Sequence, residues 1–319
     1  MCHPVRWQPP AAISNQSRRT VKNLKDVLRS SEFAVTAELA LTPQQSAHDI
    51  LDSARILADV ADAVQIPDHR NARPHVSAVA VAAHLRADGI DPVLCLNCRD
   101  RNRIALQSEL LAARSFGISN LLLARGGDLP EDHRPPASGV YDLSAIDLVR
   151  TAAAIRDGEA MDDGRGDETP KFFIGTVATA FKPKDDWEPG KLQAKADAGA
   201  QFIQLQLCMN TDVLKSYVAH LVEARLTWRF QVLANIAVLP SVDDARAMRR
   251  NNPGSIIPSA LVARLENAQD PASEGITIAA ELIRELREIP GIAGVNLQTM
   301  DDSALLAAAI LESGIRDNG

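Results

Sequence analysis

The chain has 319 residues, of which 46% are hydrophobic and 24% charged, and its formal net charge is -7 at pH 7. This composition is typical of a globular protein. The negative balance disfavours nucleic acid as a partner, because phosphate contacts need clustered Lys and Arg. The sequence has no apolar run of about 18 residues, which disfavours a membrane span, and its N-terminus lacks the apolar core of a signal peptide. Four cysteines in a chain of this length do not indicate a disulfide framework, so we expect a cytoplasmic protein.

Short apolar runs alternate with helical patterns along the chain. The predicted strands cover residues 33–40, 62–66, 91–97, 120–125, 171–177, 201–207, 229–238 and 291–297. They are apolar on both faces, as in sheets that are covered on both sides. Intervening helices force parallel pairing by crossover connections.

Eight strand–helix units predict an α/β protein with a single (β/α)8 TIM barrel, which we place at residues 33–319. Residues 1–32 would form a short N-terminal extension, with a short helix over the bottom of the barrel. The polar, Gly-rich stretch at 157–170 predicts a flexible loop on the face away from chemistry.

Cys95 and Cys98 form a CxxC in "VLCLNCRD", but no second Cys or His pair follows at zinc-ligand spacing. Cys95 also lies inside an apolar strand. We therefore interpret both as buried strand cysteines and expect no metal site.

Polar residues gather where the predicted strands end, which is where barrels of this kind form their active sites. They are Glu38, Asn97, the turn Arg125-Gly126-Gly127-Asp128, Gln204, Gln206 and Asn235. Their convergence on one mouth favours a functional interpretation. Structural alternatives stay open: Glu38 as a core carboxylate paired with a lysine, the two glutamines as a buried polar layer, and Asp128 as a turn cap.

The motifs narrow the chemistry. The sequence has no Gly-x-Gly-x-x-Gly, no phosphate loop and no Gly-x-Ser-x-Gly elbow. Several amides with one carboxylate suit a flat heterocycle with many donors and acceptors. A buried glutamate suits proton donation.

Several segments together resemble the catalytic barrel of the methylenetetrahydrofolate reductase family, over roughly residues 33–315. They are "FAVTAELAL", "NCRDRNRIALQSELLAARSFGISNLLLARGGDLP", "GVYDLSAIDLVR", "KLQAKADAGAQFIQLQL", "PGSIIPSALVARLENA" and "EGITIAAELIRELREIPGIAGVNLQTM". The resemblance implies an oxidoreductase of one-carbon metabolism and methionine biosynthesis. It would reduce 5,10-methylenetetrahydrofolate to 5-methyltetrahydrofolate, or catalyse the reverse oxidation, with FAD as flavin and NAD(P)H as electron donor.

The resemblance also implies roles for individual residues. Glu38 would protonate N10 of the folate, Asp128 would hold the pterin beside the flavin, and Gln206 would bind the folate and, in turn, the nicotinamide. The implied FAD contacts are Asn97, Arg125, Gly126, Tyr141 and Lys195, the last at the phosphates.

Departures from the family lie on the flavin side. An additional glycine precedes Asp128, Pro67 and Asp68 stand where a hydroxyl residue is common, and Cys95 stands where a His is often found. Direct hydride transfer from NADH without flavin is therefore one alternative, and a non-catalytic folate-binding subunit is another. A different barrel enzyme, such as an aldolase or a pterin methyltransferase, also stays open, although no inner strand offers a Schiff-base lysine. Whether the chain forms a homo-oligomer is not settled.

Overall fold

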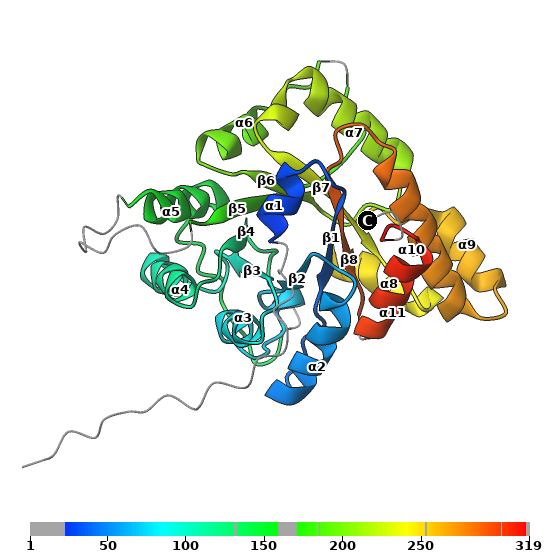
Figure 1. The fold of residues 1–319 in the computed structure, drawn as a ribbon, viewed down its shortest axis with the longest axis horizontal. Helices are drawn as coiled ribbons and strands as arrows, with labels where there is room; N and C mark the ends of the chain where they lie inside the picture. The colour runs from blue at the N-terminus through cyan, green and yellow to red at the C-terminus, as the bar shows by residue number, and fades with distance from the viewer. Residues whose placement is uncertain are drawn as a thin grey trace, which may run out of the picture.

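Eight parallel strands form a closed barrel in chain order in the computed structural model, which describes residues 23–130, 133–158, 171–184, 186–252, 254–300 and 302–316. Figure 1 shows the ring of helices around it. The strands are β1 (Ala34–Glu38), β2 (Ala63–Ile66), β3 (Pro92–Asn97), β4 (Asn120–Ala124), β5 (Phe173–Ala178), β6 (Phe202–Leu205), β7 (Gln231–Ala237) and β8 (Gly294–Gln298). The predicted TIM barrel is confirmed. Most of the loop expected at 157–170 lies outside the described residues.

Helices separate all successive strands. They are α1 (Leu24–Arg29), α2 (Ala47–Ala58), η1 (Arg70–Ala72), α3 (Ala78–Ala87), α4 (Arg103–Ser115), α5 (Ala145–Asp157), α6 (Gly190–Asp197), α7 (Thr211–Glu223), η2 (Leu226–Trp228), α8 (Val242–Asn251), α9 (Ser259–Asn267), α10 (Pro271–Arg287) and α11 (Ser303–Glu312). Three of them, α8, α9 and α10, lie between β7 and β8. Local sequence sets their boundaries: α10 begins with Pro271 after the N-cap Asp270, whose side chain accepts two backbone hydrogen bonds.

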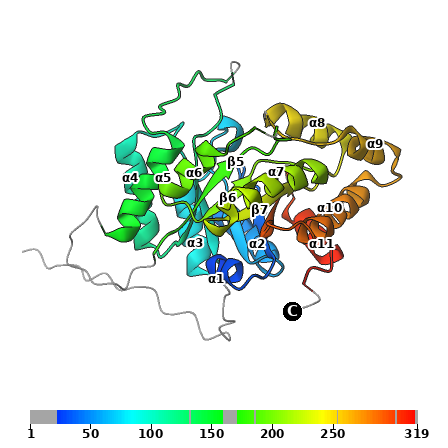
Figure 2. The same ribbon diagram turned by 90° about the horizontal axis from the view of Figure 1, so that it is seen from above.

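Helix α1 closes the amino-terminal end of the barrel. Its buried residues Leu24, Val27 and Leu28 pack against the lowest inward-facing residues of the strands, among them Phe173 and Phe202. Figure 2 shows α1 below the strands, with the β4–α5 loop and α8 on the opposite side. The opening of the barrel is therefore at the carboxyl ends of the strands.

The interior near α1 is tightly packed. Gly175 on β5 lies directly beside Phe202, and a Cβ atom there would come within 2.1 Å of the ring.

Across the described residues, we find no helix that is both long and apolar enough to cross a membrane.

Candidate functional site

A cavity of about 620 Å³ opens at the carboxyl ends of the strands. Most of the polar residues singled out in the sequence line it: Glu38, Asn97, Arg125, Gly126, Asp128, Gln204, Gln206 and Asn235. Two other predicted contacts, Tyr141 and Lys195, are not among its lining residues. The cavity also contains Gln65, Arg70 and Gln298, which the sequence interpretation did not single out.

Glu38 ends β1 on the floor of this cavity, with only 9% of its surface exposed. Gln65, its register partner on β2, donates from Nε2 to Glu38 Oε2 at 2.8 Å. Arg70 donates from NH1 to Glu38 Oε1 at 2.7 Å. The carboxylate is therefore ion-paired. Its partner is Arg70, in the loop after β2, whereas the structural alternative had proposed a lysine.

The Arg70 guanidinium extends over the end of β1 towards β8, the other neighbour of β1 in the barrel. Its NH2 donates to the side-chain oxygen of Gln298 and lies 3.4 Å from the sulfur of Met248 on α8. Its NH1 is also 3.5 Å from the carbonyl oxygen of Thr299. The sequence offered one signal that Arg70 belongs to the site, namely its position shortly after the end of the second predicted strand.

A buried ion pair occupies the end of β2. The Asp68 side chain is 2% exposed and receives two hydrogen bonds from Arg101, at 2.8 and 2.9 Å. The Asn97 amide donates to the same carboxylate at 2.6 Å, and the Asn97 backbone N–H donates at 2.8 Å. The Asn97 side chain is thus held by the protein itself.

A second ion pair lies beside the first. Arg99 donates to both carboxylate oxygens of Asp100, at 2.6 and 2.8 Å, and His69 Nδ1 lies 3.4 Å from Asp100 Oδ2. Burial opposes ionisation of Asp100, but the hydrogen bonds from His69 and Arg99 outweigh it and hold the pKa of this carboxyl well below its usual value.

The Arg125-Gly-Gly-Asp128 turn forms the exposed rim of the cavity. The Asp128 side chain is 83% exposed and accepts a hydrogen bond from Arg125 NH1 at 3.1 Å. The Arg125 guanidinium lies 4.2 Å from the centre of the Tyr141 ring, whose hydroxyl donates to the carbonyl of Gly127 at 2.8 Å. The three side chains therefore contact one another at the mouth.

The two glutamines of the sixth strand region differ in their surroundings. Gln204 on β6 is 4% exposed, whereas Gln206 follows the strand and is exposed. Gln206 Oε1 accepts a hydrogen bond from Thr179 at 2.8 Å. Gln206 therefore presents an amide at the mouth, where a bound molecule can reach it.

A buried polar layer lies across the barrel interior near the cavity floor. Asn296 donates to Asn235 Oδ1 at 3.1 Å and accepts from the Thr36 hydroxyl at 2.8 Å. These residues satisfy one another in a region where an unpaired amide would be costly.

Lys195 on α6 points to the barrel wall. Its ammonium group donates to the carbonyl oxygen of Val177 on β5. Burial, with a smaller contribution from Lys191, lowers the pKa of Lys195. Its charge is therefore engaged by the backbone.

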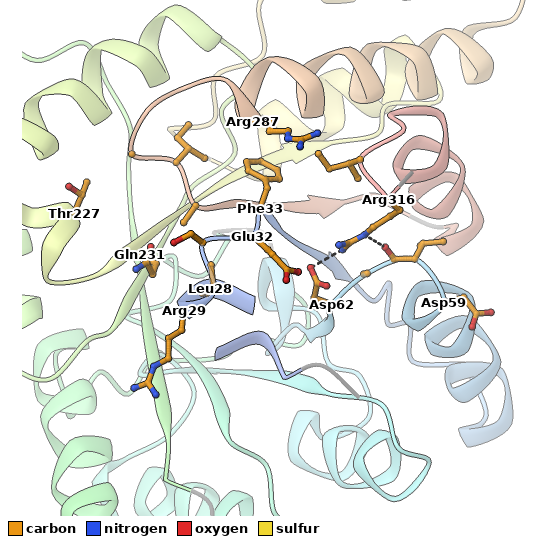
Figure 3. A pocket seen from close by; sticks show the side chains of 17 residues that line it. Leu28, Arg29, Glu32, Phe33, Asp59, Asp62, Thr227, Gln231, Arg287 and Arg316 are labelled. Atoms are coloured by element: carbon orange, nitrogen blue, oxygen red, sulfur yellow. Dashed lines mark hydrogen bonds and ion pairs between the residues drawn. The ribbon is translucent and has the colours of Figure 1, made fainter. Parts of the chain in front are cut away.

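A larger cavity, of about 1230 Å³, lies at the opposite end of the barrel near α1 (Figure 3). Its lining includes Arg316, which donates to Asp62 at 2.8 Å and to the carbonyl of Val60 at 2.9 Å. Asp62 in turn accepts from the backbone of Val35. These contacts join the ends of secondary structure elements, and the strand-end carboxylates and amides lie at the other mouth. We therefore assign the site to the smaller cavity.

Within the described ranges, no group of three or more His, Cys, Asp or Glu residues is placed to hold a metal ion. Cys98 is buried, while Cys95 is partly exposed and lines the cavity. Burial, reinforced by the carboxylates of Glu38 and Asp68, raises the pKa of the Cys95 thiol well above its usual value.

The sequence matches the family model described as methylenetetrahydrofolate reductase over residues 23–314. The chain belongs to the methylenetetrahydrofolate reductase family. A comparison with curated proteins found no match.

Among solved structures, the chain resembles a Clostridium thermocellum protein described as binding two copies of 5-methyl-5,6,7,8-tetrahydrofolic acid. That match has a TM-score of 0.65 and 13% identity, and covers 93% of this chain and 100% of the other. Oxaloacetate acetylhydrolase matches with a TM-score of 0.50 and 15% identity, over 93% of this chain and 84% of the other. 2,3-Dimethylmalate lyase matches with a TM-score of 0.51 and 12% identity, over 93% of this chain and 87% of the other. At these identities the structural matches show the shared barrel fold alone.

Members of the methylenetetrahydrofolate reductase family typically use FAD. The side chains expected to contact it make interactions within the protein in this structure. Asn97 is held by Asp68, and Lys195 by a backbone carbonyl. Arg125 contacts Asp128 and Tyr141. Beside Gly126, where a close approach to flavin was expected, a Cβ atom would come within 2.9 Å of Arg99 Cβ and 3.0 Å of Asn97 Oδ1.

Proposed function

We propose that this protein reduces 5,10-methylenetetrahydrofolate to 5-methyltetrahydrofolate, or catalyses the reverse oxidation, with a nicotinamide nucleotide as direct hydride donor. Membership of the family supports the reaction. The observation that carries the proposal is Glu38, a buried carboxyl group on the floor of a cavity whose lining includes several amide side chains.

Each residue then has a chemical task. Protonated Glu38 gives its proton to N10, which opens the five-membered ring and leaves a cationic iminium at N5. The hydride and its electron pair pass from the reduced nicotinamide to the methylene carbon, which becomes the methyl group. Gln206 and Asp128 would bind the polar edge of the pterin at the mouth. A carboxylate at the rim would also stabilise the iminium cation.

Two features support direct transfer from the nicotinamide over transfer through FAD. The Asp68–Arg101 and Asp100–Arg99 ion pairs fill the ends of β2 and β3, where the family resemblance implied flavin contacts. The lysine expected at the flavin phosphates, Lys195, donates instead to a backbone carbonyl of β5. An absorption spectrum of the purified protein tests whether the reaction proceeds without flavin, because a bound flavin would absorb blue light.

Glu38→Gln is the decisive variant. Loss of a general acid typically slows the reaction by about a hundredfold to ten-thousandfold. The assay is NADH oxidation with methylenetetrahydrofolate, with stopped-flow detection. Glu266→Gln is the matched control, since Glu266 is a half-exposed carboxylate that pairs with Arg246 on the outer helices. Near-normal turnover of the Glu38 variant would remove this residue from the mechanism.

A folate-binding protein without reductase activity is the second candidate. The Arg70–Glu38 ion pair favours it, because the guanidinium occupies one oxygen of the carboxyl group that would act on the substrate. Tight binding of 5-methyltetrahydrofolate, with no turnover in either direction and with either nicotinamide nucleotide, would support this candidate over the reductase.

A further inference from the structure

We propose that Arg70 is a positioning residue that holds the Glu38 carboxylate in an ion pair until the carboxylates of the folate's glutamate tail draw the guanidinium away. Binding of the anionic tail would thereby enable the acid. This inference rests on the proposed function, because it assigns a trigger to the same site.

The contacts of Glu38 show why a trigger is needed. Both carboxylate oxygens accept hydrogen bonds, from Gln65 Nε2 and from Arg70 NH1, so each oxygen already has a donor within the protein. Among the described residues beside Glu38, Gln65 on β2 and Cys95 on β3 carry no positive charge. Arg70 is therefore the group whose movement would release the Glu38 carboxylate from its ion pair.

The loop that carries Arg70 has an unusual backbone. His69, Asn71 and Ala72 have φ values of 46°, 55° and 60°, in the left-handed region that non-glycine residues rarely adopt. Such conformations persist where surrounding contacts impose them, and they concentrate at ligand clamps and switch regions.

Contacts on the flanking residues hold this loop in place. Arg99 donates to the carbonyl of His69 at 2.9 Å, and His69 N–H donates to His75 at 2.9 Å. The His133 ring lies 3.0 Å from the carbonyl of Ala72. The backbone is fixed on both sides of Arg70, so a change of partner would involve the Arg70 side chain, which is 22% exposed at the mouth.

The partners of Arg70 suit such an exchange. Beyond Glu38, the guanidinium contacts an amide oxygen, a carbonyl oxygen and a thioether, all of them neutral. A planar guanidinium binds carboxylates in a bidentate arrangement. The glutamate tail of a folate carries two carboxylates, and these would compete with Glu38 for the same donors.

Proton uptake on ligand binding tests the proposal without requiring turnover. Calorimetric titrations at pH 7, in two buffers of different ionisation enthalpy, give the number of protons bound with the ligand. The two ligands are 5-methyltetrahydrofolate and its diamide, in which both tail carboxylates are neutral. For the natural protein we expect uptake approaching one proton with the acid form and close to none with the diamide.

The variants identify the groups involved. Glu38→Gln should abolish the uptake, and Arg70→Met should remove the difference between the two ligands. Arg70→Lys should restore part of it. Arg73→Met, an exposed arginine in the same loop, should behave like the natural protein. In turnover assays, the diamide of the substrate should lower kcat about tenfold in the natural protein and not in Arg70→Met.

Equal proton uptake with both ligands in the natural protein would overturn the proposal, and this comparison holds even if the Arg70 variants fail to fold. A ligand difference that persists in Arg70→Met would also overturn it. If neither folate binds, the proposed function itself fails, which is a different result from binding without tail-dependent proton uptake.

Discussion

Asp68→Asn should destabilise the protein strongly, although the change removes only a charge. The carboxylate receives four hydrogen bonds, two of them from Arg101, and the two side chains are 2% and 13% exposed. Removal of one partner of a buried ion pair costs about 3–5 kcal/mol. Glu109 lies 3.6 Å from Arg101 and offsets part of that loss, so we expect about 3 kcal/mol, near the lower limit.

Urea denaturation followed by circular dichroism measures this loss of stability. For a chain of 319 residues, such a change lowers Tm by about 4–5 °C. Arg101→Met, alone and combined with Asp68→Asn, completes a double-mutant cycle, in which we expect a coupling energy of about 1–3 kcal/mol. Arg246→Met removes an exposed partner of Asp243 and is the control, with an effect below about 1 kcal/mol. A change below about 0.5 kcal/mol for Asp68→Asn, or additive effects in the cycle, would refute this reasoning.

Three further predictions concern other parts of the barrel. Gln206→Leu should raise the KM for folate, because it removes about 1–3 kcal/mol of hydrogen bonding to the ligand, and it should leave Tm unchanged. If Gln206 is only structural, the variant should show a lower Tm and unchanged kinetics. Asp100 has a depressed pKa, so its contribution to stability is present above the unfolded pKa of about 3.9 and is lost as the pH falls below it. Denaturation at pH 7 and pH 3 should thus show a smaller difference for Asp100→Asn than for the natural protein, while Asp243→Asn should leave that difference unchanged. Gly175→Ala should lower stability by about 1–3 kcal/mol, because the new methyl group would meet the Phe202 ring, and an unchanged denaturation midpoint would contradict the packing described here.

The barrel could be predicted from sequence because its signals are local. Each strand is a short apolar run, and each is bounded by residues typical of turns or helix starts. The boundaries were less predictable. The pattern predicted the first strand at residues 33–40, whereas β1 covers Ala34–Glu38. The order β1 to β8 then follows from short crossover connections.

The candidate site was only partly predictable, because its electrostatics depend on long-range pairs. Glu38 could be placed at the mouth from the position of its strand. Its partner could not, because Arg70 lies 32 residues away in a loop with other charged residues. The positions of Asn97 and Lys195 matched a family pattern, but nothing local shows that Asp68 and Val177 hold their side chains.

The closure of the barrel by α1 has a practical consequence for how the protein can be attached to a surface. Arg29 of α1 and Arg316 after α11 border the same cavity, at the end of the molecule opposite to the strand-end mouth (Figure 3). A tether joined to the chain ahead of α1 or after α11 would start from that end. On an electrode or a resin, the mouth would then face the liquid and stay accessible to substrate.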